Sequence, residues 1–122
     1  CTLRIASRHV TLALPEIKLG LLPAYAGTQF LPALVGTARA LEIMMTGRAI
    51  DAQEAQTIGL IHRIAGDEPA LLEQATAFGR EVTRWSPTAL AALRRCVEAA
   101  GATVTDAGLA VEDAGNIFLL IE

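Results

Sequence analysis

Large apolar residues occupy alternate positions in two short runs at the start of the chain, residues 2–6 and residues 9–14. A period of two is typical of a half-buried strand, because successive side chains point to opposite faces of a sheet. Pro15 ends the second run, since proline offers no amide proton to a sheet ladder. The pattern therefore predicts two consecutive short strands.

A loop and then a helix are expected after the second strand. Gly20 and Pro23 mark the loop, and the helix is expected over residues 24–35. Gly36 should close this helix, because glycine is the preferred residue just beyond a helix end. Pro32 should bend or break it one residue earlier, since a proline ring removes a backbone hydrogen bond.

Two shorter helices and a strand complete the first half of the chain. One helix is expected over residues 38–46, ended by Gly47. The next begins at the D-x-x-E sequence of residues 51–54, a relative of the capping box in which the first side chain accepts from an amide three residues later. Gly59 ends this helix, and residues 60–65 are then expected to form a short strand.

After residue 66 the hydrophobic pattern changes to a helical period. The sequence predicts amphipathic helices over residues 71–85, from Ser86-Pro87 to Gly101, and from residue 104 to the chain end. We therefore expect a mixed α/β part, residues 1–66, and a helical part, residues 67–122. The apolar face of the first of these helices consists of Leu71, Ala75, Phe78, Val82 and Trp85.

Composition excludes several classes of protein. Hydrophobic residues make up 52% of the chain and charged residues 19%, so there is enough apolar surface to build a core and disorder is not expected. The net charge is -3 and no basic cluster stands out, which argues against a nucleic-acid partner. The longest uninterrupted apolar tract is far too short to span a membrane.

The cysteines and histidines do not form a recognisable site. Cys1 and Cys96 lack the spacing of a zinc site or a disulfide framework, so we expect no metal and a reduced, cytoplasmic setting, or a mitochondrial one in a eukaryote. Cys96 is expected to be a small buried hydrophobe in a helix. His9 and His62 lie on predicted strands with no partner at metal or triad spacing, which favours structural or surface roles.

Both ends of the chain have the character of internal sequence. The chain begins at Cys1 without a methionine or a signal peptide, and the last predicted helix ends on Leu119-Leu120-Ile121-Glu122 without a cap. We therefore expect the chain to be a fragment of a longer polypeptide.

The densest cluster of candidate chemistry lies in residues 15–29. Glu16 comes just after a predicted strand end and before a loop rich in glycine and proline, a position that exposes a side chain at the rim of a sheet. A carboxylate held there is suited to act as an acid or a base. The alternative is a solvated surface turn, which is the commoner setting of a Pro-Glu pair.

The order of motifs in this region resembles one known family. The string P-E-I-x-L-G-x-x-P at 15–23, G-T-Q at 27–29 and L-P-x-L-V-G at 31–36 is similar to the signature of the crotonase superfamily, the enoyl-CoA hydratases and isomerases. The similarity continues through D-A-Q-E-A at 51–55 and G-L-I at 59–61. It is close over residues 1–66 and loose over the helical tail. The resemblance implies an α/β fold, the C-terminal half of the crotonase ββα spiral followed by a helical oligomerisation subdomain.

The resemblance also implies an activity. Crotonases bind acyl-CoA thioesters, hold the thioester oxygen with two backbone N–H groups, and in the hydratases use two glutamates to add water across the 2,3 double bond. Glu16 matches the second glutamate. The first glutamate and the oxyanion donors would precede Cys1, so hydration, isomerisation and other crotonase reactions stay open. No cofactor is implied, because coenzyme A is part of the substrate.

Three positions depart from the family pattern. Ala24 and Ala26 replace glycines, and the backbone N–H of Ala24 matches one that helps to hold the catalytic water, a role that alanine keeps where its backbone angle permits a Cβ. Phe30 stands where arginine is common, which puts any salt bridge there in doubt. For Tyr25, shaping the acyl pocket and ordinary packing under a helix are both open.

The helical tail has its own implication. Crotonase C-terminal helices pack between subunits, so the resemblance implies a homotrimer or a hexamer. A non-catalytic helical assembly module is the alternative, in which residues 67–122 drive association and the first half only supports them.

Overall fold

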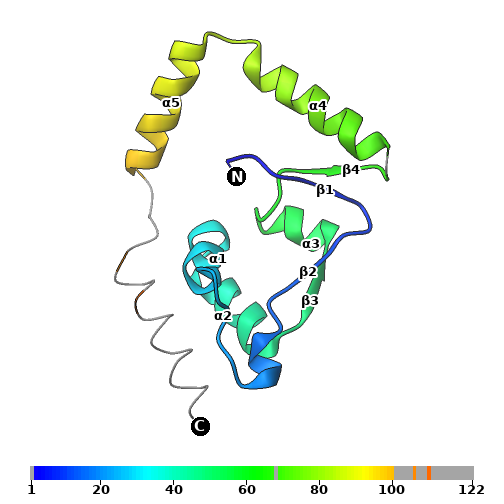
Figure 1. Cartoon of the computed structure of the whole chain (residues 1–122), viewed down its shortest axis with the longest axis vertical. Helices are drawn as coiled ribbons and strands as arrows, with labels where there is room; N and C mark the ends of the chain where they lie inside the picture. The colour runs from blue at the N-terminus through cyan, green and yellow to red at the C-terminus, as the bar shows by residue number, and fades with distance from the viewer. Residues whose placement is uncertain (1, 68, 101–105, 107–109, 111–122) are drawn as a thin grey trace.

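The computed structural model describes residues 2–67, 69–100, 106 and 110, and Figure 1 shows their arrangement. The helix expected from residue 104 onward lies outside the described residues, apart from positions 106 and 110. In chain order the elements are β1 (Ile5–Ser7), β2 (Thr11–Ala13), the 3-10 helix η1 (Glu16–Leu19), α1 (Gly27–Val35), α2 (Thr37–Thr46), β3 (Ala49–Asp51), α3 (Ala52–Thr57), β4 (Arg63–Ala65), α4 (Ala70–Thr83) and α5 (Pro87–Ala100).

The strands of the described residues form two separate pairs. β1 pairs with β4 in parallel, with Ile5 opposite Arg63, and β2 pairs with β3 antiparallel, with Leu12 opposite Ile50. The two strands expected at the start of the chain are confirmed as β1 and β2, and the strand expected over 60–65 is confirmed as β4. β3 was not predicted, because a run of three residues is too short to show a period.

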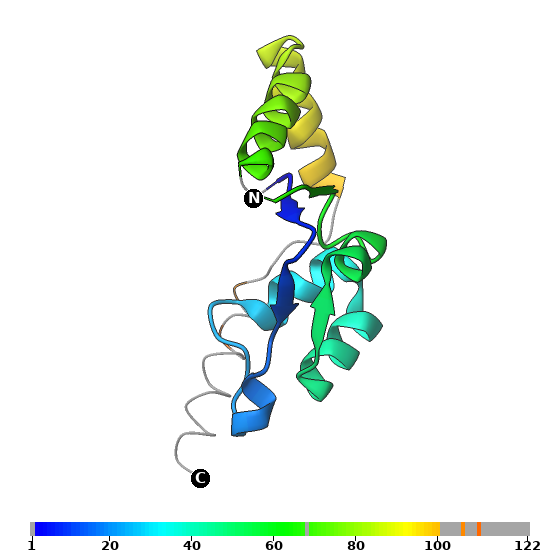
Figure 2. The same cartoon turned by 90° about the vertical axis from the view of Figure 1, so that its right-hand side faces the viewer.

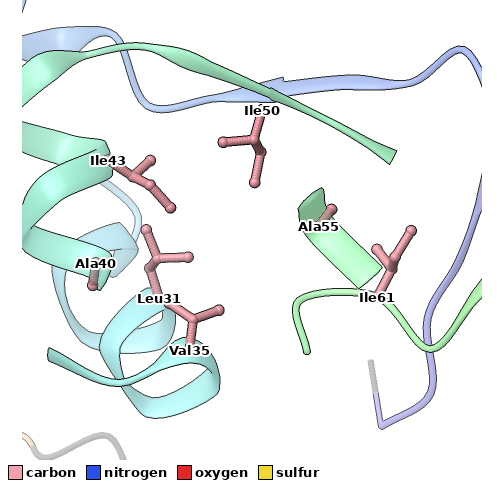
Figure 3. Close-up of a cluster of buried hydrophobic side chains, with 7 residues drawn as sticks. All are labelled: Leu31, Val35, Ala40, Ile43, Ile50, Ala55 and Ile61. Atoms are coloured by element: carbon pink, nitrogen blue, oxygen red, sulfur yellow. The ribbon is translucent and has the colours of Figure 1, made fainter. Parts of the chain in front are cut away.

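The core lies between α1 and α2 on one side and β3 with α3 on the other. In Figure 3 Leu31 and Ile43 point from the two helices toward Ile50 of β3. The cluster is small and consists only of aliphatic side chains. Hydrophobic packing alone therefore holds the short elements together at this point. Its members are Leu31, Val35, Ala40, Ile43, Ile50, Ala55 and Ile61.

The helix ends follow the sequence signals closely. Gly36 and Gly47 lie directly after α1 and α2, and the Gly47 N–H donates to the Ile43 carbonyl at 3.0 Å. At the start of α3 the Asp51 carboxylate accepts from the Glu54 N–H at 2.8 Å, as the D-x-x-E sequence predicts. The amide of Ala89 likewise lies 3.4 Å from the Ser86 hydroxyl at the start of α5.

The structure corrects the expected start of α1 and excludes a break of the helix at Pro32. The helix begins at Gly27 rather than Ala24, because Tyr25 and Ala26 have φ angles of 55° and 65°, which an α-helix does not allow. α1 also continues through Pro32. Proline removes only one donor here, and the Pro32 carbonyl still accepts from the Gly36 N–H at 2.9 Å.

Arg48 joins α2 to α3 through two carboxylates. Its Nε lies 2.6 Å from Glu42 Oε1, and its Nη2 lies 2.6 Å from Glu54 Oε1. The hydrogen bond from Arg48 is the main cause that lowers the pKa of Glu42 and that of Glu54 below the ordinary value, and its attraction adds to this. The same two carboxylates raise the pKa of Arg48, so all three groups favour their charged forms.

α4 and α5 lie at one end of the molecule, and η1 lies toward the other (Figures 1 and 2). α4 is attached to β4 by Arg63, which makes two hydrogen bonds to the Glu81 carboxylate at 2.8 and 3.1 Å. The Arg63 guanidinium also lies 3.8 Å from the centre of the Phe78 ring. Within the described ranges, each helix is too short or too polar to serve as a membrane span.

Candidate active site

Glu16 begins η1, three residues after β2 ends. The short helix is closed by backbone bonds from Lys18 N–H to the Pro15 carbonyl at 3.0 Å and from Leu21 N–H to the Glu16 carbonyl at 3.1 Å. Lys18 and Ile17 lie against Gly47 at the end of α2, so η1 is held on the body of the protein. The backbone of Glu16 is therefore fixed by β2 on one side and by α2 on the other.

The Glu16 carboxylate is not in open solvent. The residue is half-buried, and its Oε2 atom is buried without a hydrogen-bond partner among the described residues. Buried polar atoms are nearly always paired, because an unpaired carboxylate oxygen loses its hydration and gains nothing in return. The solvated surface turn does not describe this side chain, and the geometry suits a carboxylate that receives a proton donor from outside these residues.

Close packing brings the end of the loop after η1 back to Leu14, the residue that follows β2. A Cβ on Gly27 would lie 2.8 Å from the Cβ of Pro23 and 3.7 Å from Cδ1 of Leu14, so only glycine fits without displacement. Pro23 and Gly27 flank residues 24–26, and Leu14 lies two residues before Glu16. The structure thus brings the start of α1, which follows the loop with Ala24 and Tyr25, close to Leu14, two residues before Glu16.

The loop has an unusual backbone. Tyr25 and Ala26 both occupy the left-handed region, with φ angles of 55° and 65°, whereas Ala24 does not. The Cβ of Ala24 therefore carries no conformational cost, and its replacement of glycine is compatible with the local backbone. The Ala26 carbonyl accepts from the amides of Gln29 and Phe30 at 3.0 and 2.8 Å, which starts α1.

Tyr25 projects away from the rest of the chain. Its side chain is 100% exposed, so ordinary packing under a helix is wrong for this residue. Ala24 is exposed as well. Both residues are therefore available to a ligand at the surface, and their contact with substrate stays a prediction.

An apolar hollow of about 450 Å³ adjoins this contact and reaches Leu14 and Gly27. Phe30 lines it from α1 and is 54% exposed. Arg4 is the one charged residue of its lining, and its guanidinium donates to the Leu60 carbonyl at 2.5 Å. The hollow can therefore bury hydrocarbon but offers little to a phosphate. Its other lining residues are Ile5, Ala6, Leu12, Ala13, Leu31, Leu34, Ile43, Ile50, Leu60 and Ile61.

Arg4 was not singled out from the sequence, although a signal was present. It is the charged residue inside an alternating apolar run, and such a residue needs a partner once the strand is covered. The structure supplies the Leu60 and Gly59 carbonyls at 2.5 and 3.4 Å, so Arg4 ties β1 to the segment before β4.

The histidines lie outside this region. His9 Nε2 is 3.2 Å from Asp67 Oδ1, with both side chains largely exposed, and His62 Nδ1 accepts from the Arg4 amide at 3.0 Å. Neither lines the hollow, and their surface and structural settings agree with the sequence prediction. Among the residues that the structure describes, no three His, Cys, Asp or Glu side chains gather as metal ligands. Cys96 is exposed, so the prediction that it is buried is wrong.

The chain is similar to known enoyl-CoA hydratases. It is 44% identical over 93 residues to a Bacillus subtilis protein named "Probable enoyl-CoA hydratase", a match that covers 76% of this chain and 36% of that protein. It is 33% identical over 118 residues to "Short-chain-enoyl-CoA hydratase" of Clostridioides difficile, covering 97% of this chain and 74% of that protein. A solved enoyl-CoA hydratase of Bacillus anthracis superposes with a TM-score of 0.74 at 35% identity, over 80% of this chain and 38% of that one.

The family match extends beyond the motifs around Glu16. The sequence model of the enoyl-CoA hydratase/isomerase family matches residues 1–115, which includes the helical part where only a loose resemblance is expected. The superposition with a solved hydratase shows the same α/β crotonase fold over the shared region. The chain spans little more than a third of the length of two of these three relatives. The chain belongs to the enoyl-CoA hydratase/isomerase family.

Proposed function

We propose that this chain supplies an acid/base carboxylate, Glu16, for the addition of water across the 2,3 double bond of an enoyl-CoA thioester. The observation that carries the proposal is the buried Oε2 atom of Glu16, which has no hydrogen-bond partner in the described part of the chain. A water molecule donating to that atom would satisfy it and would be oriented for transfer. The names of the similar proteins support the same reaction class.

Glu16 is only one part of the chemistry that hydration needs. The enolate that develops beside the thioester needs preorganised donors, and the added water needs a second acid/base group. The resemblance assigns both to residues outside this sequence. Ala24 is exposed at the loop beside Glu16, and its backbone N–H is proposed to help to hold the water.

Isomerisation is the nearest alternative, because isomerases of the superfamily can keep the glutamate that Glu16 matches and lack the other one. Both reactions move a proton next to a thioester, so Glu16 would serve either. No feature of the described residues favours one of the remaining crotonase reactions.

Substitution of Glu16 by glutamine tests the proposal. Glutamine keeps the size of the side chain but cannot exchange a proton, so turnover of crotonyl-CoA should fall by roughly 10²–10⁴. Binding of the CoA thioester should change little, because Glu16 acts on the water rather than on the thioester. The assay uses the full natural polypeptide that carries these residues, with turnover followed by loss of enoyl absorbance and affinity by calorimetry.

Glu73→Gln is the matched control, since Glu73 is an exposed carboxylate on α4 and should leave turnover unchanged. Wild-type turnover in Glu16→Gln would remove Glu16 from the mechanism.

The helical part is proposed to assemble the protein into a trimer or a hexamer. α4 contains no buried residue, and Leu72, Trp85, Leu93 and Val97 are exposed apolar side chains on or between α4 and α5. Helices with an apolar stripe are stable when that stripe is covered, and a second copy of the chain would cover it. The assembly module without catalysis rests on the same exposed faces. The turnover assay of Glu16→Gln distinguishes this non-catalytic module from an enzyme.

A further inference from the structure

Gly47, the residue that follows α2, lies where α2 meets the short helix that carries Glu16. A Cβ on Gly47 would lie 3.1 Å from Cγ2 of Ile17 and 3.0 Å from Cε of Lys18. So short a distance is rare for a Cβ, and a side chain at position 47 would displace its neighbours by a few tenths of an ångström. The φ of Gly47 is 57°, a left-handed angle that closes α2.

The two neighbours of position 47 differ in how easily they move. Lys18 meets it with the far end of a flexible side chain, which can turn away at little cost. Ile17 meets it with Cγ2, a methyl group one bond from its own Cβ, and a branched side chain of this kind is stiff about χ1. A displacement of this methyl group therefore moves the backbone of Ile17, and Glu16 is the preceding residue.

Of the two elements in contact, η1 is the one that gives way. The Gly47 N–H donates at 3.0 Å to the carbonyl of Ile43, a core residue that is 3% exposed. Arg48, the next residue, bonds to one carboxylate on α2 and one on α3. The end of α2 is thus anchored, whereas η1 contains no buried residue and Ile17 is 42% exposed. A group added at position 47 therefore shifts η1 and leaves α2 in place.

We propose that Gly47 is a positioning residue for Glu16: without a side chain there, η1 packs closely enough on α2 to hold the carboxylate where the reaction needs it. The inference rests on the proposed function, because it assigns the acid/base step to Glu16. A misplacement of about 1 Å can cost about 10²-fold in rate. A shift of a few tenths of an ångström should therefore cost severalfold in turnover and leave the binding of the thioester unchanged.

Gly47→Ala tests the inference in the full natural polypeptide, with crotonyl-CoA as the substrate. We expect kcat to fall about three- to tenfold at an unchanged KM. Gly59→Ala is the matched control, because Gly59 also has a positive φ, 80°, but a Cβ there meets no atom closer than the Leu34 carbonyl oxygen at 4.0 Å. It should lose stability from the strained backbone and keep the kcat of the wild type. An equal fall of kcat in both variants would show that backbone strain is the cause.

Removal of the opposing methyl group should reverse the effect. Ile17→Ala deletes Cγ2, so in that background Gly47→Ala should lower kcat by less than about twofold, whereas Ile17→Val keeps Cγ2 and should leave the full loss in place. If Gly47→Ala alone does not fold, its combination with Ile17→Ala should fold and its combination with Ile17→Val should not. The same behaviour in both Ile17 backgrounds would overturn the inference.

Glu16→Gln provides the background that shows whether Gly47 acts through the carboxylate. With the carboxylate gone, Gly47→Ala should lower the residual kcat by less than about twofold. The full loss in this background would give Gly47 a general structural role and would also overturn the inference. The two hypotheses fail in different ways, because wild-type turnover in Glu16→Gln alone would contradict the proposed function.

Discussion

The loop of residues 24–26 shows how the cost of a methyl group depends on one backbone angle. Ala24 and Ala26 both stand where the family pattern has glycine, but only Ala26 has a positive φ. An L-residue in the left-handed region brings its Cβ close to the following carbonyl oxygen, whereas glycine avoids this contact. The two substitutions are chemically identical and should therefore differ in their effect on stability.

Ala26→Gly should stabilise the fold by about 0.5–1 kcal/mol, since relief of the Cβ contact exceeds the extra entropy that glycine loses on folding. Urea unfolding followed by circular dichroism gives the difference directly. Ala24→Gly is the matched control, and it should be neutral or destabilising because there is no positive φ to relieve. Equal stabilisation by both changes would show that the backbone angle is not the cause.

At the level of single residues, the candidate site could be predicted from the sequence in part. The motif around Glu16 identifies the residue, because order and spacing agree over many positions. The burial of its Oε2 atom was not predictable, since burial depends on which distant segments pack around a residue. The methionine pair at 44 and 45 suggests core filling, but only Met44 packs against the core, and Met45 is 71% exposed. The hydrophobic pattern predicts which residues form the apolar face of a helix. It does not predict which other element packs on that face.

At the level of elements, signals confined to a few neighbouring residues were reliable. Gly36 and Gly47 end their helices, and Asp51 caps α3. Elements that depend on distant partners were missed: β3 exists because Ala49–Asp51 pairs with β2, and its three residues carry no pattern of their own. η1 was expected to be a loop for the same reason, since a single helical turn has no period.

The Arg48 contacts between α2 and α3 predict a loss of stability in acid. The hydrogen bonds from Arg48 lower the pKa of Glu42 and Glu54 from the ordinary 4.5. A carboxyl with a lowered pKa in the folded state stabilises the fold above its unfolded pKa, and this contribution disappears as the pH falls through the folded value. We expect the free energy of unfolding to drop below about pH 4.5 in urea titrations from pH 7 to 3.

Arg48→Met provides the comparison, because it keeps the aliphatic stem and removes the charge. The variant should be less stable than the wild type at pH 7, and the gap should narrow toward pH 3 as the two carboxylates become protonated. All three groups are solvent-accessible, so added salt should also reduce the gap. A gap that does not change between pH 7 and 3 would show that the lost stability is not electrostatic.

At the level of the whole molecule, apolar surface is exposed to solvent in two places, the hollow beside Leu14 and the helices α4 and α5. The hollow beside Leu14 and Gly27 has an almost wholly apolar lining, and α5 presents Leu93 with 62% of its surface exposed. Surfaces of this kind on a folded protein commonly mark sites of association. The fold class was predictable from the sequence motifs, but the extent of these open surfaces was not, since it depends on which polypeptide is present to cover them.

Leu93→Glu should weaken self-association by on the order of tenfold or more, because it places a charge in a face that a second copy is proposed to cover. Sedimentation velocity over a range of concentrations measures the shift toward monomer. Leu93→Met, which keeps the apolar character, should associate like the wild type. Identical sedimentation of Leu93→Glu and the wild type would locate the assembly surface elsewhere or show that the protein is monomeric.

The parallel pairing of β1 with β4 has a consequence for how the chain reaches its folded state. The contacts between Arg4 and His62 close a loop across 58 positions of sequence, whereas the helices form from near neighbours. Closing a loop of that length costs chain entropy before the stabilising contacts can form. The pairing of β1 with β4 is therefore intrinsically slow. α4 is attached through Arg63 of β4, so its docking depends on this late step. A nascent chain would thus display α4 undocked until residues 8–62 have collapsed.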